Sequence, residues 1–290
     1  MIVSVGDLAT DLVVRLGAPE IDPVSDTPAT VSLHRGGAAA NDAAVSARLG
    51  RAARFVGAVG ADELSQAAAT SLRSLSVEVC GPPARRGWSI VVLVDPDGTR
   101  RFLTDTGDVD EWPAPDPGWL DGATRLHLSA YALCNERSAD ACEALASLAV
   151  ERGVARSIDV CSASVVRAWG VDRFAEMLQR VRPDVVKANA DEYDLLGHDA
   201  IPWAWYVVTN GADSTLVFDP DRRGPLVVPV PASEVVDSTG AGDAFVAGFL
   251  HAWDAHADPA AATAAGHAAS EQVIAGPGAD YWKADLRAES

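Results

Sequence analysis

The sequence is poor in cysteine, has no C-x-x-C pair and contains no apolar run long enough to span a membrane. Its 290 residues include 4 Cys, and scattered thiols in a chain of this length suit a reducing cytosol better than a disulfide framework or a metal knuckle. Residues 1–14 carry Asp7 and Asp11 and no basic segment, so they do not resemble a signal peptide. These absences predict a cytoplasmic protein that does not associate with membranes.

Basic residues are also scarce. Lys and Arg number 23 against 41 Asp and Glu, which gives a formal net charge of −18. Nucleic acids and anionic membranes are bound through clustered Lys and Arg, so neither is expected as a partner. ATP is not excluded, because backbone amides and a bound cation can hold phosphates on an acidic protein. Since 48% of the residues are apolar, the chain is expected to build its own core.

Strand-like and helix-like patterns alternate through the second half of the chain. Short apolar runs, typical of buried strands, are separated by longer runs with helical character. Such alternation predicts βαβ units, and therefore an α/β fold with a central, mostly parallel sheet and helices on both faces. The strand-like runs are 124–128, 154–160, 185–187 and 206–209, the helix-like runs are 138–152, 171–180, 243–253 and 259–274, and a hairpin is predicted from 216–218 and 226–229.

Several early segments do not fit a buried parallel sheet. Residues 30–34 alternate apolar and polar side chains, and 89–94 and 101–104 flank the turn sequence Asp95-Pro96-Asp97-Gly98, which is typical of a hairpin. We expect these half-exposed strands, with 13–16, to form a separate small sheet over one end of the main domain. Two helices are predicted in the same half of the chain, at 38–49 and 63–74.

The most informative segment runs from Asp237 to Asp243, with the sequence Asp-Ser-Thr-Gly-Ala-Gly-Asp. It follows an extended run and precedes an apolar helix. Its glycines allow consecutive N–H groups to point in one direction, and together with the helix N-terminus these groups form an anion site. Such a site stabilises the charge on a phosphoryl group in transfer, and the Asp243 carboxylate can accept the proton of an attacking hydroxyl. The alternative is an ordinary helix cap.

The sequence lacks the signature motifs of two common classes of nucleotide-binding protein. A nicotinamide-dependent oxidoreductase should carry G-x-G-x-x-G after its first strand, but Gly6 is followed by Asp-Leu-Ala-Thr. A P-loop NTPase needs G-x-x-x-x-G-K-[ST], which the sequence does not contain. A ligand sensor that kept the fold without catalysis should have lost the carboxylate or the glycines of the 237–243 loop, and both are present.

The 237–243 loop resembles the second signature of the ribokinase-like PfkB carbohydrate kinases, D-T-x-G-A-G-D, with Ser238 in place of the usual threonine. The resemblance implies a catalytic base, an anion hole that also contacts the nucleotide, and a possible site for a monovalent cation such as K⁺. The residues that match these roles by position are Asp243 as the base, Gly240, Ala241 and Gly242 as the anion hole, and Asp237 and Thr239 as the cation ligands.

A second match to the family is Gly36-Gly37-Ala38-Ala39-Ala40-Asn41, which fits the signature G-G-x-x-x-N at the start of a helix. Paired glycines let a ligand approach the backbone, and an amide side chain both donates and accepts hydrogen bonds. The resemblance implies that Gly36, Gly37 and Asn41 bind substrate hydroxyls. Asp11, which follows the first strand, is implied to bind two of them. Without the family, the segment is a glycine turn before a helix and Asp11 is a solvated carboxylate.

The nucleotide side is implied by Lys187-Ala188-Asn189-Ala190-Asp191-Glu192, which resembles the family's N-x-x-E motif. In the family this motif positions Mg²⁺ and phosphates. Mg²⁺ keeps several waters, so a single Glu192 is enough. Asn189 and Glu192 also fit a helix cap with its capping-box partner, and both interpretations can hold together. The sequence departs from the family's T-x-G-x-x-G at Ser214, which replaces the second glycine. Contacts to ATP are implied at Lys187, Asn189, Thr209 and Gly211.

The resemblance covers nearly the whole chain and implies one ribokinase-like domain, 1–290, with lid strands at about 12–35 and 86–106 and a homodimer formed through the lid. It implies an ATP-dependent kinase that uses Mg²⁺ and phosphorylates a hydroxyl of ribose, a hexose or a sugar acid. A nucleoside kinase and a non-catalytic sensor with the same fold are the alternatives. Few basic residues fall near the expected sugar site, Arg100 and Arg101 excepted, so an unphosphorylated acceptor is predicted.

Overall fold

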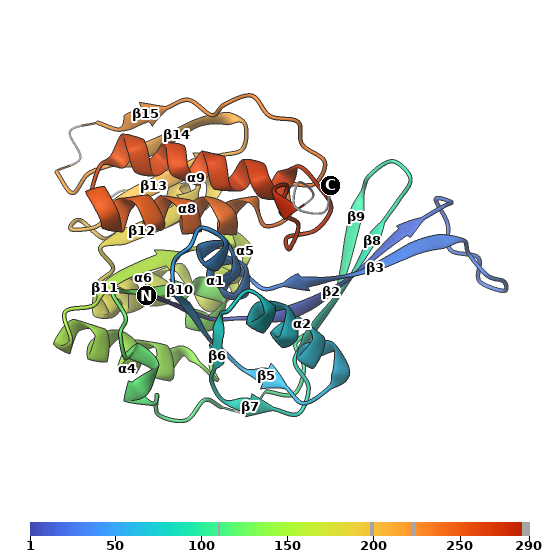
Figure 1. The fold of residues 1–290 in the computed structure, drawn as a ribbon, viewed down its shortest axis with the longest axis horizontal. Helices are drawn as coiled ribbons and strands as arrows, with labels where there is room; N and C mark the ends of the chain where they lie inside the picture. The colour runs from blue at the N-terminus through green and yellow to red at the C-terminus, as the bar shows by residue number, and fades with distance from the viewer. Residues whose placement is uncertain (110, 198–199, 222–223, 286–290) are drawn as a thin grey trace.

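A long, mostly parallel sheet crosses the body of the molecule (Figure 1). The computed structural model describes residues 1–109, 111–197, 200–221 and 224–285. Neighbouring strands pair in parallel except at one edge, where β13, β14 and β15 are antiparallel. In order across the sheet the strands are β15 (Leu226–Val228), β14 (Asp213–Phe218), β13 (Trp205–Asn210), β12 (Val185–Asn189), β11 (Ala155–Asp159), β10 (Arg125–Ser129), β1 (Ile2–Val5), β4 (Ala53–Val56) and β6 (Glu78–Cys80).

The central strands are short and buried because both faces of the sheet are covered. Every residue of β1, β4 and β10 is buried, as expected for a parallel sheet between two layers of helices. The predicted α/β fold with a central, mostly parallel sheet is therefore confirmed, and so is the hairpin of β14 and β15.

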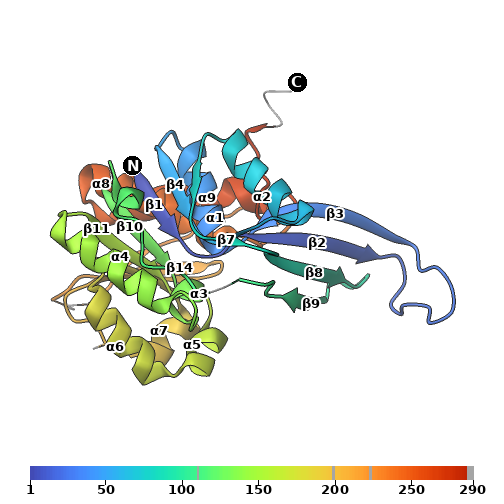
Figure 2. The same cartoon turned by 90° about the horizontal axis from the view of Figure 1, so that it is seen from below.

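Helices pack on both faces of the sheet and form a separate apolar core with each face (Figures 1 and 2). No helix in the described ranges is long and apolar enough to cross a bilayer. One layer contains α1 (Ala38–Arg48), α2 (Glu63–Ser74), α8 (Ala241–His256) and α9 (Pro259–Ile274). The other contains α3 (Ala130–Leu133), α4 (Ala139–Glu151), α5 (Ala163–Trp169), α6 (Val171–Val181) and α7 (Ala190–Leu196).

A second, smaller sheet projects from one end of the body (Figures 1 and 2). Its order is β3-β2-β8-β9, and we call it the lid. β2 pairs antiparallel with β3 and parallel with β8, and β9 is antiparallel to β8. The predicted separate small sheet is thus confirmed. Its strands are β2 (Ala9–Leu16), β3 (Ala29–Gly36), β8 (Trp88–Val94) and β9 (Arg100–Asp105).

Asp11 follows the first strand, as expected from the sequence, and it already belongs to the lid. The alternative of a solvated loop carboxylate is not what the structure has, because β2 begins at Ala9 and Asp11 lies within it. The connection between β1 and β2 is only Gly6–Leu8, so the chain leaves the main sheet and enters the lid before Asp11 is reached. The carboxylate of Asp11 is therefore fixed on a lid strand, and its position depends on the position of the lid.

Candidate active site

The carboxyl ends of the parallel strands meet the amino end of α8 close to the base of the lid. Asp243 lies in the first turn of α8, and Lys187 lies near the end of β12. A Cβ atom added to Gly242 would stand 2.8 Å from Nζ of Lys187, so the ammonium group lies directly beside the helix end. Ligands of open α/β sheets bind at this edge, where strand ends and helix N-termini converge.

Asp243 is held by a chain of buried polar side chains. Nη1 of Arg35 donates to Oδ1 of Asn41 at 2.5 Å, which leaves Nδ2 of Asn41 to donate to Oδ2 of Asp243 at 2.8 Å. Burial and the nearby charge of Asp159 raise the pKa of Asp243 to about 7, although the bond from Asn41 and the charge of Lys187 act in the opposite direction. A carboxyl group that titrates near neutrality is suited to accept a proton from a hydroxyl.

The turn before α8 exposes backbone amides at the helix end. Gly240 has φ 78°, and a Cβ atom there would stand 2.7 Å from Cβ of Ala279, so the turn requires glycine. The Ala241 amide donates to the carbonyl oxygen of Ser238 at 3.2 Å. The next two amides, of Gly242 and Asp243, stand where an α-helix leaves its first N–H groups unpaired. Of the expected anion-hole residues, Gly240 and Ala241 thus shape the turn, and Gly242 carries one of these two amides.

Lys187 forms a buried ion pair with Asp159. Its Nζ lies 3.1 Å from each carboxylate oxygen of Asp159, and the two residues are 6% and 2% exposed. Burial lowers the pKa of Lys187, but the carboxylates around it outweigh burial, and the pKa is raised overall. The ammonium group therefore stays charged. It faces Gly242 at the helix end, where it can pair with an anion.

Asp11 and Gly36 fit together on neighbouring lid strands. A Cβ atom on Gly36 would stand 2.5 Å from Oδ2 of Asp11, so glycine is needed to make room for the carboxylate. Oδ1 of Asp11 is buried and has no hydrogen-bond partner among the described residues, and burial raises the pKa of Asp11 to about 6. An unpaired buried carboxylate oxygen costs free energy, so a ligand hydroxyl bound there would be stabilised.

Gly37 makes a second close approach at the start of α1. Its φ is 97°, and a Cβ atom would stand 2.4 Å from the carbonyl oxygen of Asp7. The Asp7 carboxylate accepts the Ala38 amide at 3.0 Å and thereby caps the helix. Asp7 was not among the expected site residues, although its position between Gly6 and the lid strand is visible in the sequence. Asn41, for which a substrate contact is predicted, also contacts Asp243 directly.

A pocket of about 520 Å³ opens between the base of the lid and the body. Aromatic rings form part of its wall, and the ring centroids of Trp88 and Tyr131 are 6.4 Å apart in an edge-to-face arrangement. Arg137 also lines the pocket, and its guanidinium donates to the carbonyl oxygen of Val109. Only one of its five N–H donors is used in that bond. The pocket reaches Asp7, so it is continuous with the glycine-rich start of α1.

Arg100, at the start of β9, links the lid to the 237–243 loop. Its guanidinium donates to Oγ1 of Thr239 and to Oδ1 of Asp237, each at 2.8 Å. Burial raises the pKa of Asp237, but hydrogen bonds from Thr239, Arg100 and the Gly278 amide outweigh burial and lower it to about 2. The two side chains expected to bind a monovalent cation are therefore already paired with a positive charge from the lid.

The remaining expected nucleotide residues lie at the ends of β12 and β13. Asn189 and Glu192 form a reciprocal capping box at the start of α7, with the Asn189 amide donating to Glu192 at 2.8 Å. Thr209 is the register partner of Asn189 on β13, and Gly211 is in the open turn that follows. No group of three or more His, Cys, Asp or Glu side chains in the described part of the chain could hold a metal ion.

Sequence reasoning missed the basic residues that complete the site. Arg35 precedes the Gly-Gly pair directly, and its position in the motif was the available signal. Arg100 was noted only as a basic residue near the sugar site, and nothing in the sequence indicated its bonds to Asp237 and Thr239. Arg137 carried no signal, because only the fold brings the α3–α4 connection to the pocket.

The pfkB family carbohydrate kinase profile matches residues 1–284. The chain belongs to this family. A PfkB kinase is a phosphotransferase whose acceptor is a hydroxyl group, and the relatives of the chain are kinases. An ATP-dependent ribose-1-phosphate kinase of Halopiger xanaduensis is 31% identical over 269 residues, which cover 87% of this chain and 84% of the relative. An aminoimidazole riboside kinase of Salmonella typhimurium is 28% identical and covers 91% and 89% of the two chains.

Solved structures of PfkB kinases share the whole fold. Adenosine kinase from Sinorhizobium meliloti superposes with a TM-score of 0.82 at 22% identity, covering 100% of this chain and 99% of that one. Aminoimidazole riboside kinase from Salmonella enterica, solved with aminoimidazole riboside and an ATP analogue, has a TM-score of 0.75 at 26% identity, covering 99% and 98%. The lid and body described above therefore correspond to the ribokinase fold expected from the sequence.

The raised pKa of Asp243 predicts an acid limb in the pH–rate profile of this PfkB kinase. Below a pH of about 7 the carboxyl is protonated and cannot accept a proton, so kcat/KM should fall about tenfold per pH unit. Asp243→Asn should lower kcat by about 10²–10⁴-fold and remove that limb, while the Asn41 bond is retained. A wild-type profile that stays flat well below neutrality would contradict the role of this carboxyl as base.

Proposed function

We propose that this kinase transfers the γ-phosphoryl group of ATP to a hydroxyl of a ribose-type sugar that carries a substituent at its anomeric carbon. The observation that carries the proposal of catalysis is the position of Asp243, a half-buried carboxyl with a pKa of about 7 in the first turn of α8. Asp243 accepts the hydroxyl proton as the oxygen attacks the γ-phosphorus. The bond to the bridging oxygen breaks, and ADP leaves.

Two sets of donors stabilise the negative charge on the transferred phosphoryl group. The amides of Gly242 and Asp243 face it from the helix end, and the ammonium of Lys187 lies beside Gly242. Backbone and ammonium donors that are fixed before the reaction stabilise developing charge without reorganising. Asp159 keeps Lys187 in place, because removing it would leave the ammonium buried without its pair.

The donor in this proposal is ATP with Mg²⁺. Lys187, Asn189, Thr209 and Gly211 lie along the ends of β12 and β13, which is the edge where nucleotides bind in such sheets. Glu192 is 1% exposed and already accepts from Asn189, but each carboxylate oxygen has a further lone pair. It fits a water-mediated contact to Mg²⁺, which would supply positive charge to the phosphates.

The acceptor side favours a substituted sugar over a free one. Asp11 offers an unpaired buried oxygen for a hydroxyl, and the pocket continues past Asp7 to the rings of Trp88 and Tyr131. A free pentose would leave those rings uncovered, whereas a heterocyclic base would pack against them. Two relatives are named as kinases of ribose-1-phosphate and of aminoimidazole riboside. In both compounds the ribose has a group attached to its anomeric carbon. We therefore infer a nucleoside acceptor.

Arg137 supports one alternative acceptor, a sugar 1-phosphate. The sequence predicted an unphosphorylated acceptor because few basic residues other than Arg100 and Arg101 fall near the expected sugar site. Arg137 lines the pocket with unused guanidinium donors, and guanidinium groups bind phosphate through paired hydrogen bonds. A nucleoside and a sugar 1-phosphate thus remain the two candidate acceptors, distinguished by the role of this arginine.

Arg100 takes the place of a monovalent cation in the proposal. Asp237 already accepts hydrogen bonds from Arg100, Thr239 and the Gly278 amide, so K⁺ would have to displace the guanidinium. We infer that Arg100 supplies the positive charge and also holds the lid against the 237–243 loop. The kinase should then work without added K⁺.

A second copy of the chain is the proposed partner for the far face of the lid. The strand register places a row of apolar side chains on one face across the sheet, namely Leu33, Leu12, Val91 and Leu103. Val31 lies on the same face, two residues before Leu33 on β3. Val31, Leu33 and Leu103 are 58%, 47% and 60% exposed. Adjacent exposed apolar side chains on a sheet face are typical of an interface. Asp11 and Arg100 lie on the opposite face, so a dimer would leave the site open.

Acceptor identity is tested by ADP release from MgATP across nucleosides, ribose-1-phosphate and free sugars. We expect turnover with nucleosides and its loss in Asp243→Asn. Trp88→Leu should raise KM for a nucleoside about tenfold, because stacking and burial are lost. If ribose-1-phosphate is the acceptor, Arg137→Gln raises its KM by a similar factor and leaves kcat nearly unchanged.

Exposed Arg180 on α6, distant from the pocket, provides the matched Arg→Gln control. Failure of every compound to release ADP, while several still raise Tm, would support a sensor with the same fold instead of a kinase. Turnover on free ribose as efficient as on any nucleoside would overturn the inference about the anomeric substituent.

The role of Arg100 predicts how activity depends on K⁺. Wild-type turnover should change by less than about twofold when K⁺ replaces a bulky organic cation. Arg100→Met should lose about tenfold or more in kcat/KM, since a buried carboxylate loses its charged partner, and K⁺ should restore part of it. Arg101→Met, on the other side of the same strand, should behave like wild type. A wild-type enzyme that is inactive without K⁺ would contradict the assignment.

The far face of the lid predicts a dimer in solution. Light scattering at increasing concentration should give the mass of two chains, and Leu33→Glu should give the mass of one, because a buried charge is unfavourable at an apolar interface. Val150→Glu, at an exposed apolar residue of α4, is the control and should not change the mass. Wild-type chains that remain monomeric at high concentration would argue against this interface.

A further inference from the structure

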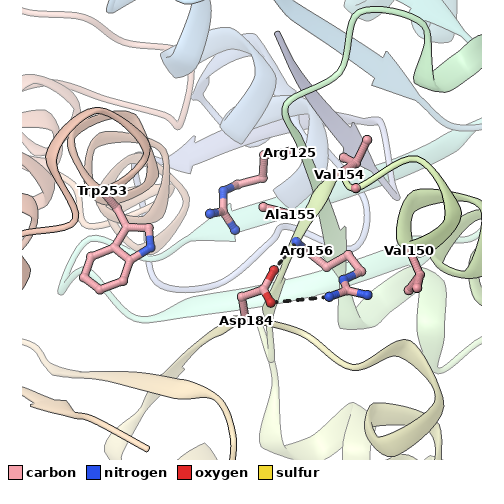
Figure 3. A pocket seen from close by; sticks show the side chains of 8 residues that line it. Arg125, Val150, Val154, Ala155, Arg156, Asp184 and Trp253 are labelled. Atoms are coloured by element: carbon pink, nitrogen blue, oxygen red, sulfur yellow. Dashed lines mark hydrogen bonds and ion pairs between the residues drawn. The ribbon is translucent and has the colours of Figure 1, made fainter.

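A second pocket lies at the amino ends of the strands of the main sheet, whereas the active site lies at their carboxyl ends. Arg125 begins β10, Ala155 begins β11 and Asp184 precedes β12, so the pocket is at the amino ends of strands whose carboxyl ends carry Lys187. Its volume is about 450 Å³. The side chain of Asp184 meets Arg156 there, and the guanidinium of Arg125 lies on the side nearer Trp253 (Figure 3).

Two arginines and one carboxylate line this pocket, although the chain as a whole has a net charge of −18. Arg125 and Arg51 both pair with Asp254, with closest distances of 2.5 and 2.6 Å. Arg156 pairs with Asp184 at 3.3 Å. Three guanidinium groups are thus paired with two carboxylates. The buried carboxyl of Asp42 is also close to Arg51 and Arg125, but burial raises its pKa to about 7 and so reduces its negative charge. The local charge is positive, which favours an anion.

Each of these arginines has a hydrogen-bond donor that is not used. Nη1 of Arg125, Nη1 of Arg51 and Nε of Arg156 are buried without a partner among the described residues. The side chain of Arg125 is only 3% exposed, and in Figure 3 its guanidinium lies between Trp253 and Arg156. Leaving charged donors unpaired in the interior is costly, so negative charge close to them is favourable. An oxyanion in the pocket, beside Arg125 and Arg156, would neutralise the excess charge.

We propose that this pocket binds a phosphate group, as inorganic phosphate or as a phosphomonoester. A phosphate has several acceptor oxygens, so it can pair with two guanidinium groups at once more readily than a single carboxylate can. The carboxylate of Asp184 disfavours binding of an anion, because it already neutralises the charge of Arg156. Trp253 offers an apolar surface beside the arginines, so a phosphomonoester with a ring would gain contact area that inorganic phosphate lacks.

The site is tested by titrating the full-length protein with inorganic phosphate and with phenyl phosphate in a calorimeter. Arg156→Gln should weaken binding about tenfold, because one charged hydrogen bond is removed. Asp184→Asn should strengthen it several-fold, since the competing charge is lost while its oxygen can still accept the Arg156 amide. Phosphate bound at the end of α8 would respond to neither change, so the pair of variants locates the ligand.

Melting curves of both variants serve as the folding control. Phenyl phosphate binding more tightly than phosphate, with the difference removed in Trp253→Leu, would identify a phosphomonoester as the ligand; equal affinities would identify inorganic phosphate. Absence of binding by wild-type protein at millimolar phosphate, or equal affinities in wild type, Arg156→Gln and Asp184→Asn, would overturn the proposal.

Discussion

The burial of negative charge at the end of α8 is the constraint on which the rest of the site depends. Asp159 is buried and Asp243 is half-buried, and the charge of Asp159 helps to raise the pKa of Asp243. The fold balances them with the ammonium of Lys187, the helix end and the Asn41 amide. Removing any one of these partners would leave an uncompensated charge. The arrangement of β12, α1 and α8 around this point is therefore a requirement of stability as well as of chemistry.

The lid depends on the same balance at its contact with the body. Arg100 pairs with Asp237, and His34 pairs with Asp280 at 2.8 Å in the C-terminal segment. Both contacts join a lid strand to a loop near the N-terminus of α8, so ionic bonds tie acceptor residues on the lid to phosphate donors on the body, in addition to the packing of the lid strands on α2. Such contacts weaken with ionic strength more than apolar packing does.

The sequence predicted the parts of this protein that local chemistry determines. Helix 63–74 has the predicted bounds, because Asp62 caps its start, and 259–274 begins at a proline after Asp258. Short helices α3 and α5 were missed, since four and seven residues carry too little periodicity. The 237–243 loop was found from its composition. Arg35 and Arg137 were not, because their partners come from distant segments that only the tertiary fold brings together.

Helix α8 has a further consequence because it is anchored at both ends. Its first turn is fixed by Gly240 against Ala279, and Asp254 in its last turn is held by Arg51 and Arg125. At 16 residues it is a strut of about 24 Å, packed along α9 through Gly248. The amides at its N-terminus therefore have little freedom left to lose when an anion arrives. The entropic cost of ordering them is met during folding, so the turnover cycle can begin with the donors already aligned.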